Sequence, residues 1–122
     1  MHYVVLWSVY KGEMESTQVL KGLLDTAVLG ALRDNNRTYG YDLVRQLRAH
    51  GFAEIADASV YGTLRRLYRA GLLTSEIVDS ETGPPRKYYS LNEAGAAQLE
   101  RSVKTWDEIT HTMDRILGRE DR

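Results

Sequence analysis

The hydrophobic period of this 122-residue chain changes twice, and the order of the changes restricts the fold. Apolar residues follow helical spacing as far as Gly71. Two β-prone runs, at 72–79 and 86–91, then flank a turn-rich segment at 80–85 that holds both prolines. Helical spacing returns after Asn92. The pattern predicts a mainly α fold in which one small β-hairpin precedes the last helix.

The part before the hairpin divides into three short helices in series. The first is expected over residues 16–33, the second ends at Gly51 and the third stops before Gly71, because glycine is favoured just past a helix end. Short polar side chains that can accept a hydrogen bond from the first helical turn precede each helix. The expected N-caps are Ser16 or Thr17, then Thr38, then Asp57 or Ser59.

The last helix is expected to begin after Asn92 as N-cap and to run to about Leu117, before Gly118. Its apolar positions alternate by four and three residues, which is typical of a coiled-coil seam. A helix this long exceeds what a small body can cover, so we expect the seam to pack on another subunit. Packing on the first helix of the same chain is the alternative. The seam positions are Leu99, Val103, Trp106, Thr110, Met113 and Leu117.

The domain organisation follows from these elements. Residues 1–15 are expected to form a β-prone N-terminal arm, unless Met14 is the natural start. Residues 16–91 form the helices and the hairpin, and residues 92–122 form the C-terminal dimerisation helix.

Composition excludes several classes of function. The chain has no cysteine, which rules out disulfide scaffolds and thiolate metal sites and agrees with a cytoplasmic location. The three histidines lie in different elements, and no Gly-rich phosphate loop precedes a helix. We therefore expect no enzymatic activity, no metal, no cofactor and no membrane segment. The net charge of −1, from 16 basic and 17 acidic residues, argues mildly against nucleic acid.

The third helix nevertheless carries a local excess of positive charge, with three arginines against one aspartate. Hydroxyls and arginines on an exposed helical face can reach base edges and phosphates in a major groove; an ordinary solvated face is the alternative. Ser59, Thr63 and Arg66 are expected opposite the apolar Val60, Leu64 and Leu67, with Arg65 and Arg69 at the margins.

The order of three helices and a hairpin is that of a winged helix-turn-helix, in which the third helix reads the groove and the hairpin meets the adjacent backbone. Arg86 and Lys87 stand just after the hairpin tip, where they could bind phosphates. A solubilising pair on an edge strand is the alternative.

Four stretches of the sequence resemble the PadR family of bacterial transcriptional regulators, and within it the small members with a single C-terminal helix. The resemblance covers residues 16 to about 117. The stretches are Leu-Lys-Gly-Leu-Leu-Asp at 20–25, Tyr-Gly-Tyr-Asp-Leu at 39–43, Ser-Val-Tyr-Gly-Thr-Leu-Arg-Arg-Leu at 59–67 with Gly71-Leu72, and Gly-Pro-Pro-Arg-Lys-Tyr-Tyr-Ser-Leu-Asn-Glu-Ala-Gly at 83–95.

The resemblance implies a homodimeric repressor that binds an inverted-repeat operator in double-stranded DNA. The C-terminal helix would make the dimer against the partner's N-terminal helix. By motif position, Ser59, Tyr61, Thr63 and Arg66 belong to the recognition helix, whereas Arg86 and Lys87 serve the wing. Tyr61 would contact a phosphate through its hydroxyl, while Tyr41 and Tyr89 are expected to be framework aromatics.

One position departs from the family pattern, because Gly62 stands where a proline is usual. Glycine is flexible and unfavourable in a helix, so the recognition helix is expected to start or bend differently.

The family also implies a small aromatic effector. Trp106, with Met113 as an adaptable neighbour, is the candidate effector site, and a core tryptophan that locks the dimer is the alternative. The chain as a whole is thus interpreted as a DNA-binding regulator. Its alternative is a winged-helix protein-interaction module that does not read DNA.

Overall fold

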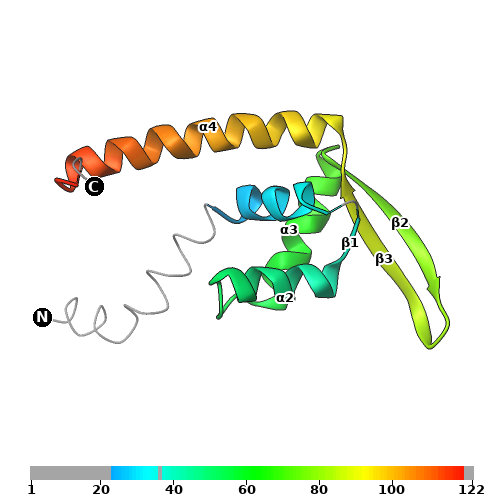
Figure 1. Ribbon diagram of the computed structural model, residues 1–122. Helices are drawn as coiled ribbons and strands as arrows, with labels where there is room; N and C mark the ends of the chain where they lie inside the picture. Colours follow the sequence, from blue (N-terminus) through cyan, green and yellow to red (C-terminus); the bar gives the residue numbers. More distant parts are fainter. Residues whose placement is uncertain (1–22, 36, 120–122) are drawn as a thin grey trace, which may run out of the picture.

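The computed structural model describes residues 23–35 and 37–119. It contains a first helix over residues 23–33, followed by β1 (Thr38–Tyr39), α2 (Gly40–His50), α3 (Asp57–Arg69), β2 (Leu73–Ser80), β3 (Gly83–Leu91) and α4 (Glu93–Ile116). The predicted mainly α fold, with three helices, a hairpin and a long last helix, is confirmed (Figure 1). The predicted arm at 1–15 and the caps Ser16 and Thr17 lie outside the described residues.

The core lies where the first helix, α2 and α3 meet at the base of the sheet. Each helix contributes an apolar stripe at helical spacing, so that burying the three stripes together removes them from water. Ile55 closes the core from the α2–α3 loop, and Leu99 closes it from α4. The buried apolar residues are Leu24, Val28, Leu29, Leu32, Leu43, Val44, Leu47, Ile55, Val60, Leu64, Leu67, Leu73, Tyr89 and Leu99.

The hairpin forms a three-stranded antiparallel sheet in the order β1-β3-β2. Its turn contains only residues 81–82, so the expected wide tip at 80–85 is wrong and Pro84 and Pro85 lie within β3. Proline lacks the backbone N–H that a ladder needs. Proline is tolerated here because β1 pairs with β3 only at Tyr88 and Tyr89. The edge of β3 that faces β1 therefore has no pairing strand at Pro84 and Pro85.

Two of the predicted helix N-caps are wrong. Thr38 lies in β1 opposite Tyr89, the N-cap of α2 is Tyr39, and the helix begins at Gly40. The N-cap of α3 is Ala56, which places Asp57 in the first turn and Ser59 beyond it. Asp57 still favours the start of α3, because a carboxylate is stabilised near a helix N-terminus. The predicted terminating glycines are confirmed, since Gly51 and Gly71 take positive φ values of 134° and 80°.

The predicted cap at Asn92 is confirmed, and this residue also attaches α4 to the body. Its Oδ1 accepts a hydrogen bond from the Gly95 N–H at 2.8 Å, while its Nδ2 donates to the Gly71 carbonyl at 2.9 Å. Gly95 is buried where α4 crosses the backbone of Leu72, and a Cβ there would collide with the Leu72 carbonyl oxygen. The start of α4 is therefore fixed to the turn that follows α3.

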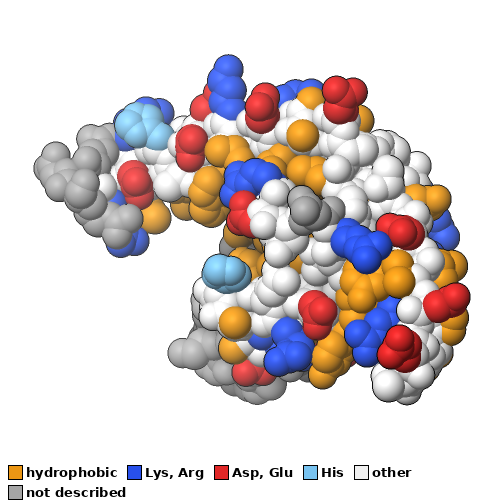
Figure 2. Space-filling view, turned by 45° about the vertical axis from the view of Figure 1, so that its right-hand side comes forward, with side chains coloured by type: hydrophobic (Ala, Val, Ile, Leu, Met, Phe, Trp, Pro, Cys, Tyr) orange, Lys and Arg blue, Asp and Glu red, His pale blue; other side chains and the backbone are white. Residues whose placement is uncertain are grey.

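Beyond Leu99, no α4 residue is buried by the part of the chain that the structure describes. Four of the predicted seam positions, Val103, Trp106, Met113 and Leu117, are exposed. The helix extends past the body (Figure 1), and hydrophobic side chains line its underside above a hollow (Figure 2). Of the predicted seam, Leu99 is thus packed in the core that includes the first helix, whereas no seam position from Val103 to Leu117 is buried by the described residues.

Candidate nucleic-acid interface

The outward face of α3 differs from the predicted one. Ala58, Gly62, Arg65 and Arg69 follow one another at i, i+4, i+7 and i+11, which places them on one side of the helix. Ala58 and both arginines are exposed, and a Cβ at Gly62 would meet nothing closer than the Arg65 guanidinium at 3.9 Å. The arginines predicted to lie at the margins are therefore the ones that project from the middle of this face.

The prediction that Thr63 lies on the exposed face is wrong. Its side chain is buried, with a residual exposure of 2%, and its hydroxyl donates to the Ser59 carbonyl at 2.8 Å. At about 100° per residue, Thr63 is only about 60° from Val60 around the helix, within reach of the core. Ser59 is exposed and lies on the margin that faces the first helix. Arg66 lies on the same margin and pairs with Asp25 of that helix.

Gly62 lies within a continuous α-helix over residues 57–69 and does not interrupt it. A start or bend that differs from other members of the family stays a prediction.

Tyr61 lies on the other margin of α3, against the start of α2. Its ring packs so closely on Gly40 that a Cβ there would be 2.6 Å from Cε1. Burial, and after it the neighbouring Asp57, Tyr39 and Tyr41, raises the pKa of the Tyr61 hydroxyl. That hydroxyl is therefore protonated at neutral pH and can donate a hydrogen bond to an anion.

Tyrosines and arginines continue this margin from α2 onto the sheet. The guanidinium of Arg86 lies 4.9 Å from the centroid of the Tyr39 ring, and that of Arg45 lies 5.9 Å from the Tyr41 ring. The Tyr39 and Tyr41 rings are 6.3 Å apart. Cation–π contacts of this kind hold each arginine over a ring while leaving its N–H donors free to bind other groups.

A second such contact lies beside the first on the sheet. Arg37 lies 5.0 Å from the centroid of the Tyr88 ring and also pairs with Glu76 at 3.1 Å. The Tyr39 and Tyr88 rings are 5.8 Å apart, so the two contacts adjoin. Lys87 lies 5.9 Å from the ring of Tyr89. Arg86 and Lys87 are both exposed, as the wing interpretation requires.

Sequence reasoning missed Arg37 and Arg45 as members of this surface. The local signal for Arg45 was its position four residues after Tyr41, because side chains at that spacing meet on a helix. Tyr89 is buried, which confirms its framework role, whereas Tyr41 is half exposed and lies on the surface.

The other candidate residues are not brought into a cavity. Trp106 and Met113 lie on the exposed side of α4, and neither lines the pocket of about 320 Å³ between the first helix and α2. Residues 23–35 and 37–119 contain no cluster of three metal-ligating side chains. Among these residues no helix is long and apolar enough to cross a membrane.

Comparison with known proteins agrees with this architecture. The model of the transcriptional regulator PadR-like family matches residues 28–101. The chain belongs to the PadR-like family of transcriptional regulators. A PadR family regulator from Eggerthella lenta is 32% identical, with a TM-score of 0.76 over 89% of this chain and 96% of that one.

Two further relatives support the assignment. A PadR-like regulator from Bacillus cereus is 33% identical, with a TM-score of 0.72 over 82% of this chain and 96% of that one. A transcriptional regulator of Mycobacterium tuberculosis is 33% identical over 86 residues, which are 69% of this chain and 74% of that protein. Transcriptional regulators are not an enzyme class, and the winged helix fold expected from the sequence is that of this family.

Proposed function

We propose that this PadR-like regulator binds double-stranded DNA through the outward face of α3, with β3 on the flanking backbone. The observation that carries the proposal is the series of basic and tyrosine side chains from Arg69 and Arg65 on α3, past Tyr61, to Tyr39 and Arg86 at the sheet. Lys87 is exposed on the other face of β3, because side chains alternate along a strand. On the sheet side of the molecule, Lys and Arg side chains lie next to hydrophobic ones, a class that includes tyrosine, with Asp and Glu side chains among them (Figure 2). Local charge explains how a chain of net charge −1 can bind a polyanion.

The side chains divide between two kinds of contact. Arg65 and Arg69, which pair with no described carboxylate, suit the bidentate recognition of guanine edges or of phosphates. Ser59 is accessible at the margin for a base edge or a phosphate. Arg86, Lys87 and the protonated hydroxyl of Tyr61 suit phosphate oxygens, which fix the register of the protein on the duplex. The buried Thr63 has no direct role in this proposal.

The assembly that we propose is a homodimer formed through α4. The exposed apolar seam, from Val103 to Leu117, supports it, because an apolar strip of this length on a single helix is normally covered by another. Two copies related by a two-fold axis would present two α3 helices to an inverted repeat. We propose further that the dimer acts as a cytoplasmic repressor of the gene that its operator precedes.

The dimer can be tested by light scattering at micromolar concentration. We expect the mass of two chains, and we expect Trp106→Asp to yield one chain, since a carboxylate on the seam would be buried without a partner. Glu108→Gln, a substitution of a polar residue on the same helix, is the matched control. A wild-type protein that stays monomeric would exclude assembly through α4.

A small planar aromatic effector would stack on Trp106 beside Met113 at the centre of this dimer. Quenching of tryptophan fluorescence by such a compound, followed by loss of DNA binding, would support this part of the proposal. Quenching that leaves DNA binding unchanged would argue that Trp106 only locks the dimer.

DNA binding is tested by fluorescence anisotropy with duplexes from the region upstream of the gene and with a random duplex, at several salt concentrations. Arg65→Gln is expected to remove roughly 1–3 kcal/mol of discrimination at one base pair. Lys87→Ala should weaken all duplexes alike and reduce the salt slope by about one. Arg101→Gln, on α4, is the control. A wild-type protein without affinity for any duplex would favour the protein-interaction module.

A further inference from the structure

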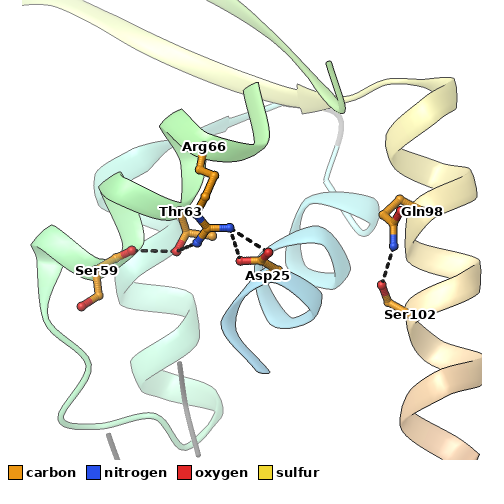
Figure 3. Close-up of polar contacts among 6 residues, drawn as sticks. All are labelled: Asp25, Ser59, Thr63, Arg66, Gln98 and Ser102. Atoms are coloured by element: carbon orange, nitrogen blue, oxygen red, sulfur yellow. Dashed lines mark hydrogen bonds and ion pairs between the residues drawn. The ribbon is translucent and has the colours of Figure 1, made fainter. Parts of the chain in front are cut away.

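One arginine of α3, Arg66, forms an ion pair with the first helix. Nη1 of Arg66 donates to both carboxylate oxygens of Asp25, each at 2.8 Å (Figure 3). Nη2 of the same guanidinium is 3.4 Å from Oγ1 of Thr63, whose hydroxyl donates to the Ser59 carbonyl. The guanidinium thus extends toward the first helix, and two of its nitrogens are engaged.

The pairing distinguishes Arg66 from its neighbours. Among the described residues, Arg65 and Arg69 form no ion pair, so Arg66 alone of the three α3 arginines has its charge neutralised. The Arg66 and Asp25 side chains are 58% and 45% exposed. A pair this accessible to solvent adds little stability, so an anion from solution can compete for the arginine at little cost.

We propose that Asp25 sets the DNA affinity of this regulator by competing with DNA phosphates for Arg66. This inference rests on the proposed DNA-binding function of α3. A carboxylate and a phosphate offer the guanidinium the same kind of charge-assisted, two-oxygen acceptor. An arginine that stays with Asp25 releases no counterion when DNA binds, so its charge adds nothing to the electrostatic part of the affinity.

The experiment is a double-mutant cycle of Asp25→Asn and Arg66→Gln. It is measured by fluorescence anisotropy on a fluorescein-labelled random 24-base-pair duplex between 50 and 200 mM salt. Asp25→Asn should tighten binding and steepen the salt slope by about 0.9, the value for one added phosphate contact. Over this range, the gain at the lowest salt should then exceed that at the highest by about threefold. Arg66→Gln alone should change affinity less than twofold, because the wild-type arginine is already occupied.

The double variant separates competition from simple repulsion between Asp25 and DNA. If Arg66 carries the effect, Asp25→Asn gains nothing when Arg66 is already glutamine. An equal gain in both backgrounds would overturn the proposal in favour of plain charge repulsion. A loss of affinity in Asp25→Asn would overturn it in favour of Asp25 positioning Arg66 on DNA. Asp107→Asn on α4 controls for the change in net charge.

Failure of this inference can be told from failure of the proposed function. If the wild-type protein binds the duplex and Arg65→Gln changes this binding, whereas Asp25→Asn does not, the proposed DNA-binding function stands and only the competition between Asp25 and DNA is excluded. A wild-type protein that binds no duplex would exclude both the DNA-binding function and the competition. Asp25→Ser repeats the test where asparagine disturbs the first helix, and thermal unfolding verifies that each variant is folded.

Discussion

Replacing Asn92 by alanine should destabilise the protein by about 2 kcal/mol. The side chain makes two hydrogen bonds that alanine cannot, from the Gly95 N–H to Oδ1 at 2.8 Å and from Nδ2 to the Gly71 carbonyl at 2.9 Å. Loss of an N-cap costs about 1 kcal/mol, and loss of the hydrogen bond to the exposed Gly71 carbonyl costs up to about the same. The hydrogen bond from the Asn92 backbone N–H to the Leu72 carbonyl, at 3.3 Å, should survive.

Asn92→Asp is the matched variant, because it separates the two bonds. Aspartate keeps the capping acceptor and places a favourable negative charge at the helix N-terminus, but it loses the donor to the Gly71 carbonyl. We therefore expect about half of the destabilisation. For a chain of this size, 1 kcal/mol corresponds to roughly 4 °C in Tm, so the alanine variant should melt about 8 °C lower.

The assay is urea unfolding followed by circular dichroism at 222 nm, at one fixed protein concentration. The concentration must be fixed because the stability of a dimer depends on it. An alanine variant as stable as the wild type would refute the claim that Asn92 fixes α4 to the body. An aspartate variant as unstable as the alanine variant would show that the cap contributes little and that the bond to Gly71 carries the effect.

Three further predictions concern other positions. Gly95→Ala should destabilise by about 1–2 kcal/mol in the same unfolding assay, because collision with the Leu72 backbone outweighs the higher helix propensity of alanine. Gly62→Ala, where the Cβ would meet only the Arg65 guanidinium at van der Waals distance, should instead stabilise by up to about 1 kcal/mol. Thr38→Val should raise Tm, because the buried Thr38 hydroxyl has no hydrogen-bond partner among the described residues; no rise would indicate that the hydroxyl is satisfied. Because burial raises the pKa of Tyr61, the hydroxyl keeps its proton to a higher pH in the folded state than in the unfolded state. The free energy of unfolding should therefore fall as the pH rises above about 10, and it should fall less in Tyr61→Phe. An equal fall in both proteins, measured by urea unfolding, would contradict that assignment.

Most of the fold could be predicted from sequence because its signals are local. The stripe of Val60, Leu64 and Leu67 and the glycines that end α2 and α3 act within a few residues of one another, as does the cap at Asn92. The N-cap predicted at Thr38 is wrong because the strand that contains Thr38 exists only through pairing with β3, some fifty residues later in the chain. Nothing in the segment around Thr38 distinguishes a two-residue strand from a capping position.

The site was less predictable because its geometry depends on packing between elements. Thr63 is polar and yet buried, since the core covers a wider arc of α3 than the apolar stripe alone indicates. Arg66 and Asp25 are separated by 41 residues, and no periodicity relates them. The stacking of Arg86 on Tyr39 joins the wing to β1 in the same non-local way. Sequence thus identified the helix and the wing correctly, whereas the direction of each side chain required the tertiary structure.

The attachment of α4 at one end has a mechanical consequence. The 24 residues from Glu93 to Ile116 span about 36 Å at 1.5 Å per residue. In a lever arm of that length, a tilt of about 5° at the Asn92–Gly95 pivot moves the far end by about 3 Å, close to the rise of one base pair. In a dimer formed through α4, a small change of angle at this pivot would therefore change the distance between the two α3 helices by several ångströms.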